Sequence, residues 1–136
     1  MKRLQLTADT VGPVGRGHPW VYANGVEGRA ETGTPVQLLD QRGRPVAWGI
    51  ADEGPIAVRV LGRHAEPVPS LLLKRIEHAV RLRQKIIRKD TNAFRLINGA
   101  GDGLPGLIID RYDEVLVIRL YSRAWLPHMS ALLDAL

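Results

Sequence analysis

The densest group of residues that could do chemistry lies between Asn98 and Asp110, where four glycines surround Asp102. Glycine-rich loops bind phosphates when their backbone amides belong to the N-terminus of a helix. Here an apolar, strand-like run at 107–109 follows the loop, and the spacing fits neither the dinucleotide pattern nor the P-loop pattern. Residues 91–112 therefore favour a hairpin with specialised turns over a nucleotide site.

Asp102 and Asp110 could form an acid pair, but the sequence offers no nucleophile or set of metal ligands beside them. Structural roles are favoured for both. Asp102 fits an Asx-type turn, in which the carboxylate accepts hydrogen bonds from amides two residues further on. Asp110 could instead meet a buried arginine. We expect no catalysis at this loop.

The chain has 136 residues and no cysteine, which excludes disulfides, thiolate metal sites and a cysteine nucleophile. Methylation at carbon 5 of a pyrimidine generally needs a thiolate that attacks carbon 6, so this chain cannot carry that chemistry alone. The four histidines are scattered without ligand spacing, so we expect no metal site. No apolar run approaches the roughly 18 residues of a membrane span, and no signal peptide is evident, so we expect a cytoplasmic protein.

Positive charge is concentrated in residues 71–92. The net charge of the whole chain is +5, and this segment holds seven Lys or Arg residues against Glu77 and Asp90. Residues 1–70 and 93–136 are each nearly neutral. The basic segment is therefore the part of the chain most suited to a polyanionic partner.

Residues 71–88 show helical periodicity, with Ser70 as the expected N-cap. One face is apolar and consists of Leu72, Leu73, Ile76, Ala79, Val80, Ile86 and Ile87. The opposite face carries Lys74, Arg81, Lys85 and Arg88. An ordinary solvated face would mix charges of both signs, so we interpret these four cations as a track for RNA phosphates. A plain charged surface is the alternative.

Arg83 falls in the middle of the predicted apolar face. An unpaired buried guanidinium would be very costly. We therefore expect Arg83 to pair with Asp102 or Asp110 and to connect the helix with the loop.

The first 68 residues contain five short β-segments separated by turn residues, a pattern typical of a small barrel. The segments are 3–7, 20–23, 36–40, 46–50 and 56–61. At and just before the second segment, Arg16, His18 and Trp20 could present phosphate donors and a stacking aromatic to RNA. The alternative is that Trp20 anchors the barrel core.

Beyond the hairpin, a tight turn at Asp113-Glu114 leads to a strand at 115–121, which predicts a three-stranded meander. Residues 125–136 begin another amphipathic helix, which has no cap residue before the sequence stops. We expect the chain to be cut from a longer protein at this point.

Three blocks of the sequence resemble the ribosomal RNA large-subunit methyltransferase I family. They are GHPWVYAN at 17–24, RIEHAVRLR at 75–83 and NAFRLINGAGDGLPGLIIDRY at 92–112. The GHPW and GDGLPG blocks are specific, and the likeness covers nearly the whole chain. One departure is Ala100, where the family usually has an acidic residue, so any role of that carboxylate in the loop is in doubt.

The resemblance implies an S-adenosylmethionine-dependent RNA cytosine-5 methyltransferase with a PUA domain, a small central α+β domain and a Rossmann-like catalytic domain. This chain would be an α+β protein, with a PUA-like RNA-binding barrel at 1–68 and a linker helix plus truncated central domain at 69–136. S-adenosylmethionine would bind the catalytic domain, which is absent here. We expect this part to bind ribosomal RNA through Arg16, His18, Trp20, Lys74, Arg81, Lys85 and Arg88.

Two other functions are compatible with the same residues. The chain could be a stand-alone RNA-binding adaptor. It could also be a homodimerising interaction module that binds no nucleic acid.

Overall fold

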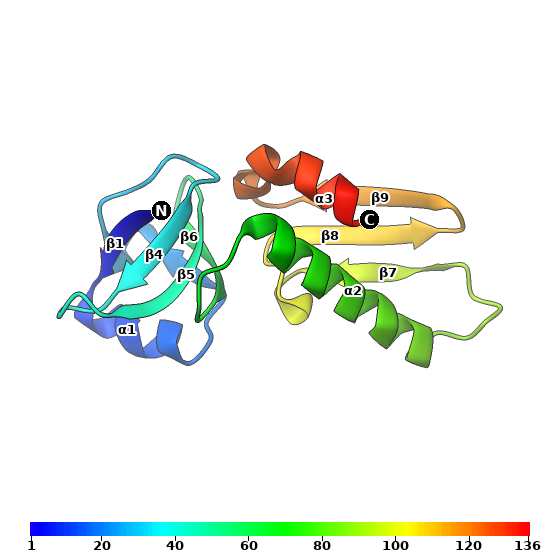
Figure 1. Cartoon of the computed structure of the whole chain (residues 1–136), viewed down its shortest axis with the longest axis horizontal. Coiled ribbons are helices and arrows are strands. Elements are labelled where there is room, and N and C mark those ends of the chain that lie inside the picture. Colours follow the sequence, from blue (N-terminus) through cyan, green and yellow to red (C-terminus); the bar gives the residue numbers. More distant parts are fainter. The chain divides into compact units, whose positions relative to one another are not determined.

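The computed structural model describes residues 1–136 and divides into two compact units (Figure 1). The first unit contains residues 1–66 and 123–127, and the second contains residues 67–122 and 128–136. Each unit has its own sheet and at least one helix, so the predicted α+β class is confirmed. None of the helices combines the length and the hydropathy that a membrane span requires.

The first unit is built on a nearly closed, barrel-like sheet of six strands in the order β2-β6-β5-β4-β1-β3. β1 and β4 are parallel, and the other neighbours are antiparallel. Alternate side chains of these strands form the core, with Val36, Leu38 and Val58 fully buried. The strands are β1 (Lys2–Leu6), β2 (Trp20–Tyr22), β3 (Val26–Glu27), β4 (Pro35–Leu39), β5 (Pro45–Ala51) and β6 (Ile56–Gly62).

All five predicted β-segments of this unit are present, but a helix between the first two was missed. Helix α1 (Ala8–Gly15) has the sequence ADTVGPVG, whose two glycines and proline disfavour a helix. Packing overrides this preference, because Val14 is buried in the barrel core. The Thr7 hydroxyl also lies 2.7 Å from a side-chain oxygen of Asp9 and 2.7 Å from that of Thr10.

Helix α2 (Val68–Ile86) begins earlier and ends earlier than predicted. Pro67 is the N-cap, so the expected cap at Ser70 was wrong. Proline is tolerated in a first helical turn because the amide that it lacks would have no partner there. At the other end, Ile87 is extended and its amide bonds the Arg83 carbonyl oxygen at 2.8 Å. Arg88 therefore lies beyond the helix and not on its outer face.

The buried face of α2 is narrower than the predicted one. Leu71, Leu72, Ile76 and Ala79 are buried together with Val68, at helical spacing. Leu73 is 46% exposed, because it lies about 100° beyond Leu72 on the side away from the buried Leu71. Ile86, in the last turn, is 65% exposed.

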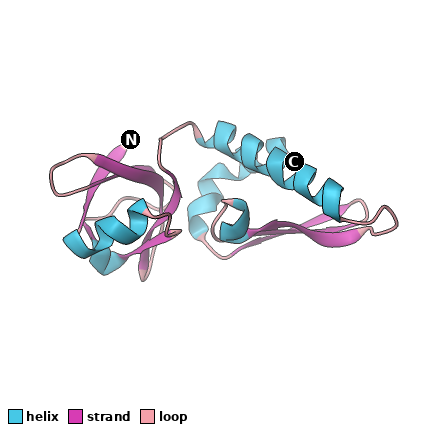
Figure 2. Cartoon of the chain, turned by 90° about the horizontal axis from the view of Figure 1, so that it is seen from below, coloured by secondary structure: helices cyan, strands magenta, loops and turns pink.

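The second unit contains the predicted meander, β7 (Ala93–Asn98), β8 (Leu107–Tyr112) and β9 (Val115–Leu120), in that order. A short 3-10 helix, η2 (Gly99–Asp102), lies in the loop between β7 and β8. Helix α2 and the terminal helix α3 (Met129–Ala135) pack together on one face of this sheet (Figures 1 and 2).

The terminal helix is shorter than the predicted 125–136. Residues Arg123–His128 form a 3-10 segment, η3, that contains Pro127. A proline here removes one helical hydrogen bond and crowds the carbonyl four residues earlier, which delays the α-helix to Met129.

We predict that Gly49→Ala destabilises the first unit. A Cβ on Gly49 would collide with the backbone carbonyl of Arg59 and would lie 3.0 Å from the Cα of Val60, so β5 and β6 would have to separate. Overpacking of this kind lowers the free energy of unfolding by about 1 to 3 kcal/mol. Thermal unfolding followed by circular dichroism measures it. Gly15→Ala is the control, because its Cβ would meet only Val46 at 3.9 Å. Equal melting temperatures would contradict the prediction.

Candidate nucleic-acid interface

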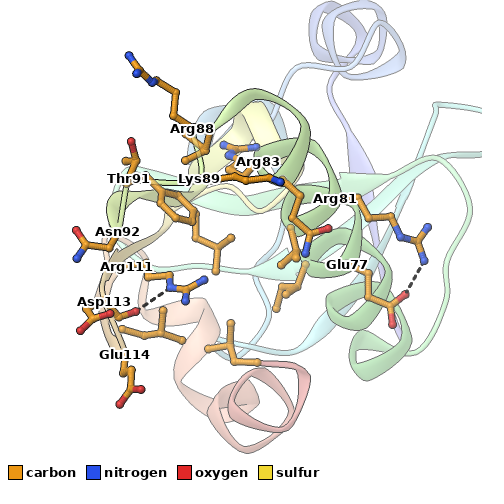
Figure 3. A pocket seen from close by; sticks show the side chains of 18 of the residues that line it. Glu77, Arg81, Arg83, Arg88, Lys89, Thr91, Asn92, Arg111, Asp113 and Glu114 are labelled. Atoms are coloured by element: carbon orange, nitrogen blue, oxygen red, sulfur yellow. Dashed lines mark hydrogen bonds and ion pairs between the residues drawn. The ribbon is translucent and has the colours of Figure 1, made fainter.

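An open hollow with a volume of about 910 Å³ lies within the second unit (Figure 3). Its walls are the second half of α2, the residues that follow it, the three-stranded sheet and the end of α3. We refer to it as the α2 hollow. Its volume falls in the range of pockets that hold small organic ligands.

The floor of the α2 hollow is apolar. It is formed by Ile76, Val80, Ile87, Phe94, Leu96 and Leu116. Phe94 of β7 pairs with Arg111 of β8, and Arg111 pairs with Leu116 of β9. Side chains of directly paired residues project to the same face of a sheet, so these three form a row across the meander.

Arg111 is the cation closest to this floor. The carbon at the centre of its guanidinium lies 5.8 Å from the ring centroid of Phe94, a cation–π arrangement. Its Nε donates to the carbonyl oxygen of Asp113 at 2.8 Å, so the plane of the guanidinium is fixed (Figure 3). No sequence pattern pointed to Phe94 or Arg111 as site residues.

The rim of the α2 hollow carries more positive than negative charge. Arg81, Arg83, Arg88, Lys89 and Arg111 line it, against Glu77, Asp113 and Glu114. Arg81 lies 4.0 Å from Glu77, and Arg88 lies 3.6 Å from Asp90. All four side chains are more than half exposed. Exposed pairs of this kind are weak, so Arg81 and Arg88 can exchange these partners for another anion.

Arg83 has a different role from the other rim cations. It donates from both terminal nitrogens to the two carboxylate oxygens of Asp102, each at 2.8 Å. The Arg83 side chain is 13% exposed and that of Asp102 is 6% exposed. The predicted pairing of Arg83 is therefore confirmed, with Asp102 as its partner rather than Asp110.

The predicted Asx turn at Asp102 was wrong. Its carboxylate accepts a hydrogen bond from the backbone amide of Asn98, four residues earlier, at 2.6 Å. The side chain thus bonds to the start of the loop and not to an amide that follows it. The neighbouring Ala100, where an acidic residue is usual in the resembling family, is exposed on η2. The loop thus closes through Asp102 without a carboxylate at position 100.

Asp110 is buried and pairs with Arg95, at 2.8 and 3.3 Å, and with Arg119, at 3.7 Å. The hydrogen bond from Arg95 lowers the pKa of the Asp110 carboxyl, and Asp110 in turn raises the pKa of Arg95. Asp110 is therefore ionised at neutral pH and fits a structural role better than that of a proton donor.

The structure separates the predicted phosphate contacts into two groups. Arg81 and Arg88 line the α2 hollow, whereas Lys74 and Lys85 lie on α2 outside it. All four residues are exposed. Lys89, which was not among the predicted phosphate contacts, lines the hollow as well.

On the barrel unit, His18, Trp20 and Tyr22 form a column of edge-to-face rings. The ring centroids are 4.8 Å apart for the first pair and 6.4 Å for the second. Trp20 is half-buried, and its Nε1 is buried without a hydrogen-bond partner. His18 Nδ1 lies 2.9 Å from the Trp20 carbonyl oxygen, while Arg16 is exposed and Tyr22 is 53% exposed. Trp20 is therefore neither fully buried nor fully exposed, and its contact with RNA stays a prediction.

Residues 4–63 match the model of a family described as a PUA-like domain. A ribosomal RNA large subunit methyltransferase from Deinococcus radiodurans is 36% identical over 87% of this chain and 32% of its own length. Ribosomal RNA large subunit methyltransferase I from Vibrio cholerae is 36% identical over 89% of this chain and 32% of its own length.

The chain is homologous to part of these ribosomal RNA methyltransferases. It spans about a third of the length of the curated relatives that it matches. The protein of the same name from Salmonella arizonae is 33% identical, over 98% of this chain and 35% of its own length. The predicted resemblance is therefore confirmed over most of the sequence.

Two solved structures share the fold at 17% identity. One, from Streptococcus mutans, is described as a candidate SAM-dependent methyltransferase and matches with a TM-score of 0.88 over 99% of this chain and 37% of its own. The other, a candidate methyltransferase complexed with SAH, matches with a TM-score of 0.89 over 99% of this chain and 36% of its own. The elements of the barrel unit and of the second unit therefore recur in these structures.

We predict that Arg83→Met lowers the free energy of unfolding by about 1 to 4 kcal/mol, since it leaves the buried Asp102 carboxylate without its partner. Chemical denaturation measures the loss. Arg81→Met is the matched control, because its side chain is 74% exposed and its ion pair is long. Equal stability of the two variants would contradict a structural role for the Arg83–Asp102 pair.

Proposed function

We propose that this chain binds ribosomal RNA and positions it for an S-adenosylmethionine-dependent methyltransferase of which it is a part. The observation that carries the proposal is the exposed positive charge along and just beyond α2, in a chain homologous to ribosomal RNA methyltransferases. Clustered cations bind nucleic acid because each phosphate contact releases condensed counterions.

In this proposal the two units contribute different contacts. Lys74, Arg81, Lys85 and Arg88 contact phosphates of the RNA backbone, because they are exposed and concentrated in one segment. Arg16, His18 and Trp20 contact bases at the surface of the barrel, where the half-buried ring of Trp20 has a fixed position beside His18. Phosphate contacts position a protein on RNA, and base contacts select the sequence.

The finer features follow from the resemblance. The reaction would be methylation at carbon 5 of cytosine, with S-adenosylmethionine and the nucleophilic cysteine supplied by a separate catalytic domain. The barrel at 1–68 would be the RNA-binding domain and 69–136 the start of the central domain. Ribosomal RNA as the substrate implies a location in the cytoplasm.

We predict that replacing the four α2-segment cations, Lys74, Arg81, Lys85 and Arg88, by Gln weakens binding to all RNA sequences alike. Each lost phosphate contact lowers the slope of log affinity against log salt by roughly 0.7 to 0.9. Fluorescence anisotropy with a ribosomal RNA fragment over a salt series measures both quantities. Reversal of the four charges to Glu would abolish binding.

The Arg16→Gln, His18→Gln double variant is the contrast, because it should alter discrimination between RNA sequences and leave the salt slope nearly unchanged. If the slope of log affinity against log salt were unchanged after all four α2-segment replacements, these residues would not contact phosphates. This result would favour the homodimerising interaction module, which sedimentation at increasing protein concentration would then detect.

We also predict that this chain alone neither methylates RNA nor binds S-adenosylmethionine. It has no cysteine to attack a pyrimidine, and the strands of its second unit form an antiparallel meander rather than a nucleotide-binding βαβ unit. Calorimetric titration with the cofactor is the measurement. A micromolar dissociation constant would contradict the proposal that a separate catalytic domain binds S-adenosylmethionine.

A further inference from the structure

The α2 hollow has features that a track of phosphate contacts does not need. A phosphate track needs exposed cations on a convex or shallow surface, as Lys74 and Lys85 provide. The α2 hollow adds a concave apolar floor and a cation stacked on an aromatic ring. These two additions suit the flat, apolar faces of a nucleobase.

We propose that the α2 hollow holds the base of one unpaired RNA nucleotide. The inference rests on the proposed RNA binding and deepens it, because it names the RNA structure that this part of the chain selects. The volume of about 910 Å³ exceeds what one nucleotide needs, so a base can enter together with its sugar. A fully paired helix cannot insert a base there, because its bases are stacked inside the duplex.

The placement of the base follows from the fixed position of Arg111. Its Nε is bonded to the Asp113 carbonyl oxygen, while its two terminal nitrogens make no hydrogen bond. The guanidinium therefore presents two free donors to the edge of a base, or one flat face for stacking. Phe94 lies on the other side of this guanidinium, and Leu116 extends the apolar floor beside it.

Polar groups at the rim supply the remaining contacts. Asn92 and Gln84 line the hollow with side-chain amides, which can both donate to and accept from the edge of a base. Arg88 and Lys89 follow the end of α2 and are exposed, so they are placed to take the phosphates on either side of the nucleotide. In Figure 3, Arg88 projects outward from the rim whereas Arg111 lies within the hollow.

The charge of the rim argues for RNA over a second copy of this chain. Arg81, Arg88, Lys89 and Arg111 outnumber Glu77, Asp113 and Glu114, even when Arg83 is set aside because Asp102 neutralises it. The chain itself carries a net charge of +5, so a second copy would meet repulsion at this rim.

The test compares two RNA hairpins that differ only in one adenine, which is inserted unpaired into the stem of one and is missing from the other, fully paired one. Anisotropy titrations of the full chain give the affinity for each. We expect the bulged hairpin to bind at least about five-fold more tightly, the effect of one stacked base. A 2-aminopurine at the unpaired position should change its fluorescence on binding.

Arg111→Gln and Lys85→Gln separate the hollow from the phosphate track. Both remove one exposed positive charge from the second unit, but only Arg111 lines the hollow. Arg111→Gln should bring the affinity for the bulged hairpin down to that for the paired one. Lys85→Gln should weaken binding to both hairpins by the same factor. Phe94→Leu, which keeps an apolar floor without the ring, should reduce the preference for the bulge as Arg111→Gln does.

Each outcome decides the proposal. Equal binding of both hairpins by the unaltered chain would overturn the nucleotide site and leave RNA binding standing. If the unaltered chain bound neither hairpin, the RNA-binding function and this site would both be overturned. If the Arg111→Gln variant still preferred the bulged hairpin to the paired one, the unpaired base would not bind in the α2 hollow. A dimer that Arg111→Gln dissociates would identify a second copy of the chain as the occupant and overturn the proposal.

Discussion

The second unit depends on one ion pair, Arg83 with Asp102. Arg83 donates to both carboxylate oxygens and also to the Arg95 carbonyl oxygen at 3.3 Å, so one side chain connects α2 with the loop and with β7. Asp102 uses a further lone pair for the Asn98 amide. A buried carboxylate is tolerated only when such partners replace its water. This interaction therefore ties α2 to the loop and to β7, and both α2 and β7 line the α2 hollow.

A β-bulge in β7 decides which residues face one another across the hairpin. Asn98 pairs with Ile108 and Ile97 with Ile109, but Arg95 pairs with Asp110 because the register shifts between Arg95 and Ile97. Without the shift Arg95 would face Arg111, two like charges in direct opposition. The shift therefore creates the Arg95–Asp110 ion pair, and it also brings Phe94 opposite Arg111.

The sequence revealed features that rest on local patterns. The meander followed from its turn residues. The cost of burying a lone guanidinium in an apolar face predicted a carboxylate partner for Arg83, but it did not decide between Asp102 and Asp110. The sequence did not reveal α1, whose glycines and proline argue against a helix until the barrel core buries Val14. It also missed the pair of Phe94 and Arg111, because counting back from the loop without the bulge places Phe94 opposite Tyr112. Both misses come from interactions between residues distant in the chain, which local propensity does not encode.

A count of the cations in residues 71–92 overstates the positive charge that is available to a polyanion. Seven cations lie in residues 71–92, yet Arg83 is neutralised by Asp102, and Arg75 donates to the Gly103 carbonyl oxygen. These two hold the loop against α2, while Lys74, Arg81, Lys85, Arg88 and Lys89 remain exposed. The cations of this segment thus fall into two groups: Arg75 and Arg83 stabilise the unit, and the other five are exposed on α2 or just beyond its end. Because Arg75 and Arg83 hold α2 to the loop, the backbone that carries Lys74, Arg81 and Lys85 is already ordered, so a polyanion that bound there would not have to order this helix.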